Sequence, residues 1–468
     1  MRTLLPVLGR VDRGRGQGER VVEKRQFTVL SLFSGGMGLD LGMEETKRFK
    51  LLACVEKVPA FRETIRRNRD AGRLGNGDLK VYGDIAELKP DEVMAELGLR
   101  PGHLDLIIGG PPCQTFSTTG KRATVQDPRG TLLWQFLRFV EQLRPKMFLM
   151  ENVRGLMSAA LRHRHIKDRP DKGGPPLEPD EQPGSVIRRF LLDLRHAYRL
   201  DCFEVNAVNY GAPQLRERAI FVGNRFNRLV EFPAPTHGQE KEGGEQTLFD
   251  LGPKLRPFLT LRQALEGLDD PAPVIMDFSP RKKRYLAMVA AGSNWRSLPP
   301  DVAKDAMGKA YHAKGGRSGW WRRLSFDLPC PTIVTMPNHA QTSLCHPTET
   351  RALTLRECAR VQEFPDEWEF CGKAHEQYAQ VGNAVPVRLG RACGEVVAEH
   401  LDAIYEAQLA AAAGDHPSCR VVYVKSHVRT RQWFKAGKTF VWQDGKENGH
   451  VKYGPAKTQR KVREVQGE

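Results

Sequence analysis

Short apolar runs rich in β-branched residues alternate with helical segments along the first half of the chain. Six such runs predict strands at residues 27–33, 51–56, 105–110, 146–153, 202–208 and 219–223. Apolar residues at helical spacing predict helices at 59–69, 131–143 and 185–198, and Ser185 is expected to cap the last of them. Continuous apolar strands that alternate with helices predict an α/β fold with a doubly wound, mainly parallel sheet. Ligands of such sheets bind at the carboxyl ends of the strands.

The alternation stops at about residue 225. From there to about residue 345 the chain is irregular and rich in Arg, Trp and Pro, which predicts a separate, smaller domain, and helical patterning returns at 351–410. Two polar stretches with Pro and Gly, 163–184 and 237–255, predict surface loops or local disorder. Near the end, KTFVWQDGKENGHVKY fits a hairpin that turns at Asp444-Gly445.

The charge of the chain is strongly positive and uneven. There are 72 Lys and Arg against 56 Asp and Glu, a net charge of +16, and residues 416–468 contribute +8 of it, 12 basic minus 4 acidic. This excess predicts a polyanionic partner, with a merely basic surface as the alternative. We expect the basic tail to add nonspecific phosphate contacts, or else to form a small domain that contacts a partner.

No apolar run approaches the roughly 18 residues of a membrane helix. We therefore expect no membrane contact and a cytoplasmic or nucleoid-associated location. The nine cysteines are scattered without any CxxC pair, so neither a zinc site nor a disulfide framework is predicted, and no metal is expected. Cys345 and His346 are adjacent, but without a second close pair we interpret Cys345 as an ordinary thiol.

A glycine-rich turn and a following acid predict a nucleoside site. The first predicted strand runs into FSGGMGLDLG (33–42), where backbone N–H groups and a helix N-terminus can approach a ligand closely. The second strand ends at Glu56, about twenty residues on, where a carboxylate can accept both hydroxyls of a ribose. Asp84 in YGDI could take an adenine amino group, with a turn or capping role as the alternative.

A thiol, a carboxyl and two guanidinium groups fall at neighbouring strand ends. Cys113 follows DLIIGG behind two prolines, so its thiol is presented rigidly at the functional edge of the sheet. Glu151 ends another apolar strand, where partial burial favours a carboxyl that can donate a proton. Arg216 and Arg218 lie on one side of an extended segment. We interpret this set as one catalytic site, against the alternatives of an inert buried cysteine and ordinary ion pairs.

A series of motifs runs in a fixed order through most of residues 27–395. The motifs are LFSGGMGLDLG, EK at 56, GDI, GGPPCQTFSTTGKR, DPRGTLLW, ENVRG, QLRERAIFVG, RALTLRECARVQEFPD and QVGNAVPV. In all of them the chain resembles the cytosine-C5 DNA methyltransferases of the bacterial restriction-modification type. The resemblance implies a Rossmann-like sheet that uses S-adenosylmethionine, with a smaller, irregular target-recognition domain. One departure is Met37, which stands where the family commonly has glycine.

The resemblance implies a role for each site residue. Cys113 would attack C6 of a cytosine flipped out of double-stranded DNA, Glu151 would hold and protonate N3, and Arg218 would bind O2 with Arg216 beside it. C5 would then take the methyl group of S-adenosylmethionine, leaving S-adenosylhomocysteine. The cofactor contacts implied are Phe33, Gly35, Gly38, Glu56, Asp84, Ile85, Pro112, Asn383 and Val385. The DNA contacts expected are Ser117, Lys121, Arg129, Gln214, Arg322 and Arg323.

The same resemblance divides the chain into five parts. They are a basic N-terminal arm (1–26), a catalytic S-adenosylmethionine-binding domain (27–224), a target-recognition domain (225–350), a return to the catalytic domain (351–410) and a basic C-terminal extension (411–468). Within the recognition part, the segment from Arg323 to Pro337 is expected to pack back on the catalytic domain.

Two other functions fit these motifs. An RNA methyltransferase that acts on transfer RNA would share the scaffold, and a catalytically silent DNA-binding paralogue would keep the fold. The long recognition part favours duplex DNA, and the presence of Cys113, Glu151 and Arg218 together favours an active enzyme. We expect it to act as a monomer, alone or beside a companion restriction endonuclease.

Overall fold

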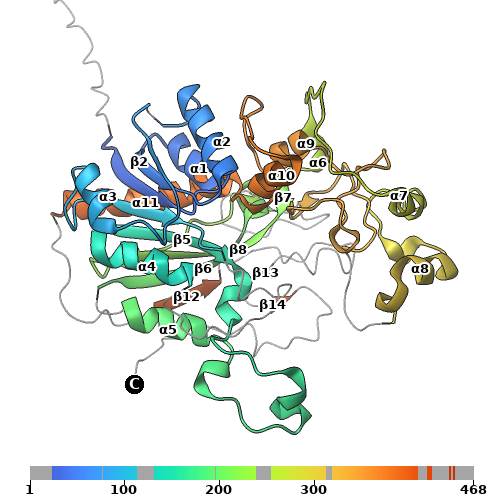
Figure 1. Ribbon diagram of the computed structural model, residues 1–468, viewed down its shortest axis with the longest axis horizontal. Helices are drawn as coiled ribbons and strands as arrows, with labels where there is room; N and C mark the ends of the chain where they lie inside the picture. Colours follow the sequence, from blue (N-terminus) through green and yellow to red (C-terminus); the bar gives the residue numbers. More distant parts are fainter. Residues whose placement is uncertain are drawn as a thin grey trace, which may run out of the picture.

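The computed structural model describes residues 24–75, 77–112, 131–194, 197–238, 255–312, 319–408, 419–423, 442–443 and 446–447. An eight-stranded sheet lies at its centre, with the strand order β12-β6-β8-β5-β4-β1-β2-β3 (Figure 1). The strands are β1 (Phe27–Leu32), β2 (Phe49–Val55), β3 (Lys80–Tyr82), β4 (Leu106–Gly109), β5 (Met147–Val153), β6 (Arg199–Asn206), β8 (Glu217–Asn224) and β12 (Cys419–Tyr423).

The sheet is mainly parallel, with one reversed strand. β1 pairs in parallel with β2 and β4, as do β2 with β3 and β4 with β5. β8 runs antiparallel between β5 and β6. The predicted doubly wound α/β fold is therefore confirmed, and the carboxyl ends of β1, β2, β4 and β5 meet at one edge.

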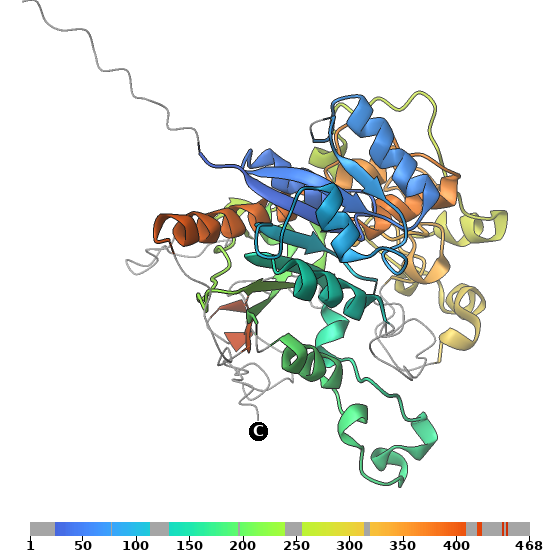
Figure 2. The same ribbon diagram turned by 60° about the vertical axis from the view of Figure 1, so that its left-hand side comes forward.

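The helices cover both faces of this sheet. Around it lie α1 (Gly38–Glu45), α2 (Pro59–Asp70), α3 (Pro90–Glu96), α4 (Leu132–Leu143), α5 (Ser185–Leu194), α9 (Leu355–Val361), α10 (Ala374–Asn383) and α11 (Val387–Glu406). Figure 2 shows α11, in orange-red, on the opposite side of the sheet from α4 and α5. In the described ranges no helix has both the length and the apolar character needed to cross a membrane.

Alternate residues of each strand build two separate cores. In β1, Phe27 and Val29 join a cluster with α1, α9, α10 and α11, whereas Leu30 and Leu32 join a cluster with α3, α4 and α5. Because successive side chains of a strand point to opposite faces, a run that is apolar at every position requires cover on both sides. The continuous apolar runs seen in the sequence are explained by this arrangement.

The part of the chain that is expected to recognise the target (225–350, called the recognition part below) has a small apolar core of its own. A third apolar cluster contains residues from Phe278 to Ala352, including Trp321 and side chains of α7 (Pro280–Leu286) and α8 (Pro300–Met307). Figure 1 shows α7 and α8 away from the sheet. In contrast, α6 (Leu261–Leu265) and the short strand β11 (Cys330–Pro331) contact the catalytic part, since Leu261, Cys330 and Ile333 belong to its first cluster. β11 pairs in parallel with β7 (Gln214–Leu215).

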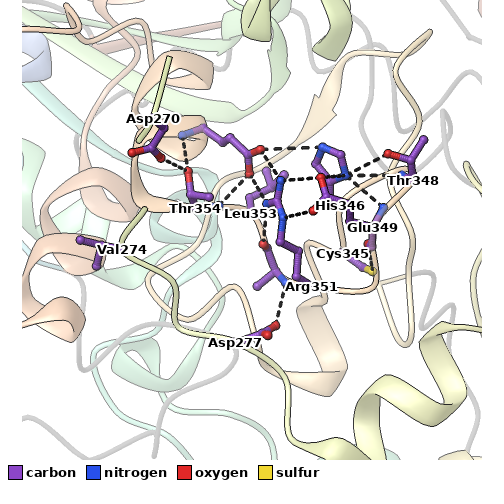
Figure 3. Close-up of polar contacts among 12 residues, drawn as sticks. Asp270, Val274, Asp277, Cys345, His346, Thr348, Glu349, Arg351, Leu353 and Thr354 are labelled. Atoms are coloured by element: carbon purple, nitrogen blue, oxygen red, sulfur yellow. Dashed lines mark hydrogen bonds and ion pairs between the residues drawn. The ribbon is translucent and has the colours of Figure 1, made fainter. Parts of the chain in front are cut away.

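Arg351 connects the end of the recognition part to α9 (Figure 3). Its Nη1 and Nη2 donate to the two carboxylate oxygens of Glu357 at 2.8 and 2.9 Å, and its Nε donates to Glu349 at 2.9 Å. Beside it, the Thr354 hydroxyl donates to Asp270 at 2.9 Å. Planar bidentate pairs fix direction as well as distance, so they hold the recognition part in one orientation against the catalytic part.

The polar insertion 163–184, predicted as a surface loop or local disorder, forms a lobe that hydrogen bonds hold together. It contains three short 3₁₀ turns, Ile166–Asp168, Pro170–Lys172 and Pro179–Glu181. Ser185 begins α5, and its hydroxyl accepts from the Leu161 N–H at 2.9 Å and donates to the Asp180 carbonyl at 2.8 Å. Ser185 was expected to cap α5. This expectation is corrected, because the serine hydroxyl joins the two ends of the lobe.

Two edge strands were not predicted. β3 has only three residues, and β12 comes from the basic C-terminal extension, where it pairs in parallel with β6. Further on, β13 (Trp442–Gln443) and β14 (Lys446–Glu447) pair antiparallel, in agreement with the predicted hairpin. Its turn residues, Asp444 and Gly445, lie outside the described residues.

Candidate active site

The turn after β1 wraps around the carboxylate of Glu56. Phe33, Gly35 and Met37 take left-handed backbone angles, with φ of 57°, 56° and 69°. The Gly35 N–H donates to Glu56 Oε2 at 2.8 Å, and the Val58 N–H donates to Oε1 at 2.8 Å. Burial raises the pKa of Glu56, although these two N–H groups act in the opposite direction. The carboxylate is therefore fixed in place at the end of β2.

Met37 holds a conformation that suits glycine better. Left-handed angles are uncommon for residues with a side chain. Here the side chain is fully buried in the first core cluster, so packing offsets the backbone cost. The turn of this chain therefore accommodates a methionine at this position.

The far end of the chain packs directly on this turn. A Cβ on Gly36 would lie 2.9 Å from the Gln380 carbonyl oxygen, and one on Gly38 would lie 2.1 Å from that of Val385. Such approaches are possible only without a side chain. Asn383 is exposed at the end of α10 and Val385 is buried beside the turn. The structure thus brings Gly35, Gly38, Asn383 and Val385 together, and Gly38 serves close packing.

The residues expected around an adenine also converge. Ile85 and the partly buried Phe33 belong to one apolar cluster, although they follow different strands, β3 and β1. Asp84 forms an ion pair with Lys57 at 2.7 Å and accepts a hydrogen bond from the Ala86 N–H at 3.0 Å. The Lys57 ammonium lowers the pKa of Asp84, which keeps this carboxylate charged. Lys57 was not predicted, although it directly follows Glu56.

Glu151 and Arg218 form a buried pair at the ends of two neighbouring strands. Arg218 Nε lies 2.5 Å from Glu151 Oε1, and each side chain is 11% exposed. The antiparallel register of β5 and β8 places Val153 opposite Arg218, which brings the two strand ends together. Arg218 also donates to the Glu217 carbonyl at 2.7 Å. The pair therefore has a fixed geometry and little contact with bulk water.

The segment that leads to Cys113 lies against this pair. A Cβ on Gly110 would be only 3.1 Å from Glu151 Oε2, so a side chain here would crowd this carboxylate. The buried Asn152 donates through Nδ2 to the Pro111 carbonyl at 3.0 Å. Pro112 follows and is exposed. Cys113 itself lies outside the described residues, as do Ser117, Lys121 and Arg129. Asn152 was missed by the sequence reasoning, although ENVRG contains it.

Arg216 and Gln214 lie in the interior. Arg216 is 1% exposed and donates to the carbonyls of Ile333 at 3.0 Å and Gly382 at 2.9 Å. Burial lowers the pKa of Arg216. Gln214 is fully buried and donates to the carbonyl of Val361 at 3.0 Å. Arg216 thus ties the strand of Arg218 to the recognition part and to the end of α10.

Arg323 has its guanidinium inside the recognition part. It is 5% exposed and donates to five oxygens of residues 286, 289, 346, 349 and 350, at 2.7 to 3.1 Å. The neighbouring Arg322 donates to the Ser343 carbonyl at 3.3 Å, and burial lowers its pKa to about 10. The Arg323 guanidinium is therefore buried away from the solvent face expected for a DNA contact, whereas Arg322 is partly exposed. Within the described ranges, no group of three or more His, Cys, Asp or Glu is arranged to hold a metal ion.

Comparisons with known proteins identify relatives of this chain. The family model for the C-5 cytosine-specific DNA methylases matches residues 27–168 and 189–399. The type II methyltransferase M.Sau96I of Staphylococcus aureus is 34% identical over 382 residues, which cover 82% of this chain and 78% of that protein. M.Eco47II of Escherichia coli, also a type II methyltransferase, is 34% identical over 397 residues, 82% of each chain.

A solved structure shares the fold. It is a candidate DNA modification methyltransferase encoded within an Escherichia coli prophage, with a TM-score of 0.51 and 24% identity over 81% of this chain and 100% of that one. The doubly wound sheet and the matching family model are those of a methyltransferase. The chain belongs to the C-5 cytosine-specific DNA methylase family and is a DNA cytosine-5 methyltransferase. The resemblance drawn from the motifs is confirmed.

Proposed function

We propose that the protein methylates C5 of a cytosine flipped out of a specific double-stranded DNA sequence, through a transient bond between Cys113 Sγ and C6. The observation that carries this proposal is the buried Glu151–Arg218 pair at 2.5 Å, set against Gly110 three residues before Cys113. N3 and O2 are neighbouring atoms of cytosine. A carboxyl and a guanidinium held side by side can therefore bind both at once.

The residues of the chain divide the reaction between them. The Cys113 thiol releases its proton to solvent as sulfur bonds to C6, while Glu151 gives a proton to N3, so the ring passes to a neutral enamine. Arg218 holds O2 throughout. Bound S-adenosylmethionine would supply the electrophilic methyl group for C5. The C5 proton then passes to solvent, its bonding electrons restore the C5–C6 double bond as the thiolate leaves C6, and N3 returns its proton to Glu151.

The pocket residues fit this methyl donor. The fixed Glu56 carboxylate suits a ribose diol, and the shared apolar cluster of Phe33 and Ile85 suits an adenine ring. Asp84 is available to the adenine edge, and Pro112, Asn383 and Val385 complete the wall. Because M.Sau96I and M.Eco47II are type II methyltransferases, we propose that this protein is also a restriction-modification methyltransferase. It acts as a monomer beside a companion endonuclease.

Trapping on a modified base tests the mechanism. We expect the protein, with S-adenosylmethionine, to form a covalent adduct on duplex DNA containing 5-fluorocytosine, because fluorine at C5 blocks the last elimination. Cys113→Ala should abolish both the adduct and methyl transfer. Glu151→Gln should lower turnover by about 100-fold or more, in the range typical of a lost general acid.

A control and two contrary outcomes complete the test. Cys371→Ala removes a buried thiol from a residue that is hydrogen-bonded to Thr64 of α2, and it should leave the adduct intact. An adduct that persists in Cys113→Ala would refute the proposed nucleophile. Faster methylation of transfer RNA than of duplex DNA, measured side by side with labelled donor, would replace DNA as the substrate.

A further inference from the structure

The segment Asp84–Ile85 follows β3, a short strand at the edge of the sheet. β3 has three residues, forms the edge of the sheet and pairs there with β2. So short an edge strand supplies few backbone bonds, and the residues after it depend on other contacts for their position. The ion pair from Lys57 is one such contact, but the lysine side chain is 72% exposed. Exposed ion pairs contribute little to order.

Arg138 holds this segment from the other side. It lies on α4, and its Nη2 donates to the Ile85 carbonyl at 2.6 Å in partly buried surroundings. The Ile85 side chain is 3% exposed and packs in the same cluster as Leu133 and Leu137 of α4. A hydrogen bond from a charged donor in such surroundings contributes more than an exposed ion pair. Arg138 is therefore the stronger of these two anchors.

The face of α4 that carries Arg138 contains polar side chains with buried polar atoms. Thr131, Gln135 and Arg138 are spaced by four and three residues, so they lie on one side of the helix. Thr131 Oγ1, Gln135 Oε1 and Arg138 Nε are all buried and have no hydrogen-bond partner among the residues that the structure describes. Thr131 also makes no capping bond to its own helix. Buried polar atoms without partners are rare, and here three occur together.

We propose that Arg138 is a positioning residue for the methyl donor. It holds the Ile85 carbonyl, and through it the Asp84–Ile85 segment, where the adenine edge binds. The inference rests on the proposed function, because it takes Asp84 and Ile85 as adenine contacts. Arg138 acts through the backbone and takes no part in the chemical step. Its loss should weaken binding of the donor and leave the rate at saturating donor nearly unchanged.

The test compares two arginines that bind backbone carbonyls. Arg225 donates to the Arg144 carbonyl at 3.1 Å just after β8 ends, at the edge of the sheet opposite the site. We expect Arg138→Met to raise the Kd of S-adenosylhomocysteine, measured by calorimetry without DNA, by about tenfold. The KM for S-adenosylmethionine should rise in parallel, with kcat within about twofold. Arg138→Lys should recover part of the affinity, and Arg225→Met should change neither constant.

Each other outcome has a distinct meaning. An unchanged Kd in Arg138→Met, a fall in kcat with unchanged KM, or an equal rise in Kd in Arg225→Met would overturn the role of Arg138. If Arg138→Met does not fold, Arg138→Gln carries the test, with an expected rise in Kd of about threefold, and no rise overturns the inference. If the unsubstituted protein does not bind S-adenosylhomocysteine, the proposed function fails instead.

Discussion

Arg216 and Arg218 are two residues apart, yet the structure gives them different surroundings. Strand periodicity predicts that both point to one side, where both would meet the substrate. Arg216 lies between β7 and β8, however, so the alternation is interrupted there. Arg218 faces Glu151, whereas Arg216 binds carbonyls in the interior. The sequence carries the residue types of the site, but not this local break in the strand.

Asp40 allows a test of how burial shapes stability. It lies in the first turn of α1, is 3% exposed, and burial raises its pKa to about 7, against the effect of a hydrogen bond with Ser31. In the unfolded chain this carboxyl titrates near 3.8. Its contribution to stability is therefore fully present below about pH 4 and is lost as the pH rises towards 7.

We predict that Asp40→Asn stabilises the protein at pH 8 by about 1–3 kcal/mol, because the amide stays neutral. At pH 5 this difference in the free energy of unfolding between the variant and the unsubstituted protein should be smaller. Urea unfolding at the two pH values measures both differences. Asp78→Asn, at an exposed position, serves as the control and should show no such gap. A gap of equal size at both pH values would contradict the prediction.

At the scale of elements, α1 and α11 meet through glycines. A Cβ on Gly42 would lie 2.1 Å from the Val387 carbonyl oxygen and 2.5 Å from the Arg391 nitrogen. Gly390 approaches Gly38 and Leu39 in the same way from α11. Because α1 follows the glycine-rich turn and α11 follows Val385, this contact joins the two segments for which we propose cofactor binding. The glycine-rich sequence predicted a ligand, and the structure adds a helix contact.

We predict that Gly42→Ala destabilises the protein by about 2 kcal/mol or more, since backbone atoms on α11 cannot move aside as a flexible side chain can. Gly77→Ala provides the control, because a Cβ there would meet nothing within 4 Å. It should stay within about 0.5 kcal/mol of the unsubstituted protein. Thermal and urea unfolding measure both. Equal stability of the two variants would show that α1 and α11 can separate without cost.

The elements that were predicted differ from those that were missed in a physical way. The strands β1, β2, β4, β5, β6 and β8 are covered on both faces, so each contains a largely apolar run that stands out in the sequence. β3 lies at the edge with three partly exposed or exposed residues between glycine and charged residues, so its pattern is weak. The lobe before α5 depends on specific bonds, such as the Arg164–Glu181 ion pair. Composition alone cannot reveal such bonds.

At the scale of the molecule, the site is assembled from segments far apart in sequence. Strand order alone brings the ends of β1, β2, β4 and β5 to one edge, which is why Glu56 and Glu151 could be grouped from the sequence. The return of residues 380–385 onto the glycine turn depends on the packing of α10 and α11. Only the family resemblance anticipated it. The interior positions of Arg323 and Gln214 were not anticipated at all.

Truncation can separate two roles that we expect of the C-terminal extension. β12 covers the edge of β6, so its removal would expose unpaired backbone groups. The chain beyond Tyr423 holds most of the excess positive charge of the extension. A truncation after Tyr423 keeps β12, whereas a truncation after Asp415 removes it. Comparing the two distinguishes a loss of charge from a loss of sheet.

We predict that truncation after Tyr423 leaves the melting temperature unchanged but reduces the salt dependence of DNA binding. Each phosphate that the protein no longer neutralises lowers the slope of log K against log salt by about 0.9, so two or three fewer bound phosphates lower it by about 2. Truncation after Asp415 should in addition lower the melting temperature and promote aggregation through the edge of β6. Fluorescence anisotropy with a duplex over a salt series gives the slopes. An unchanged slope in both truncations would mean that the extension does not bind phosphates, and equal melting temperatures would mean that β12 adds nothing to the sheet.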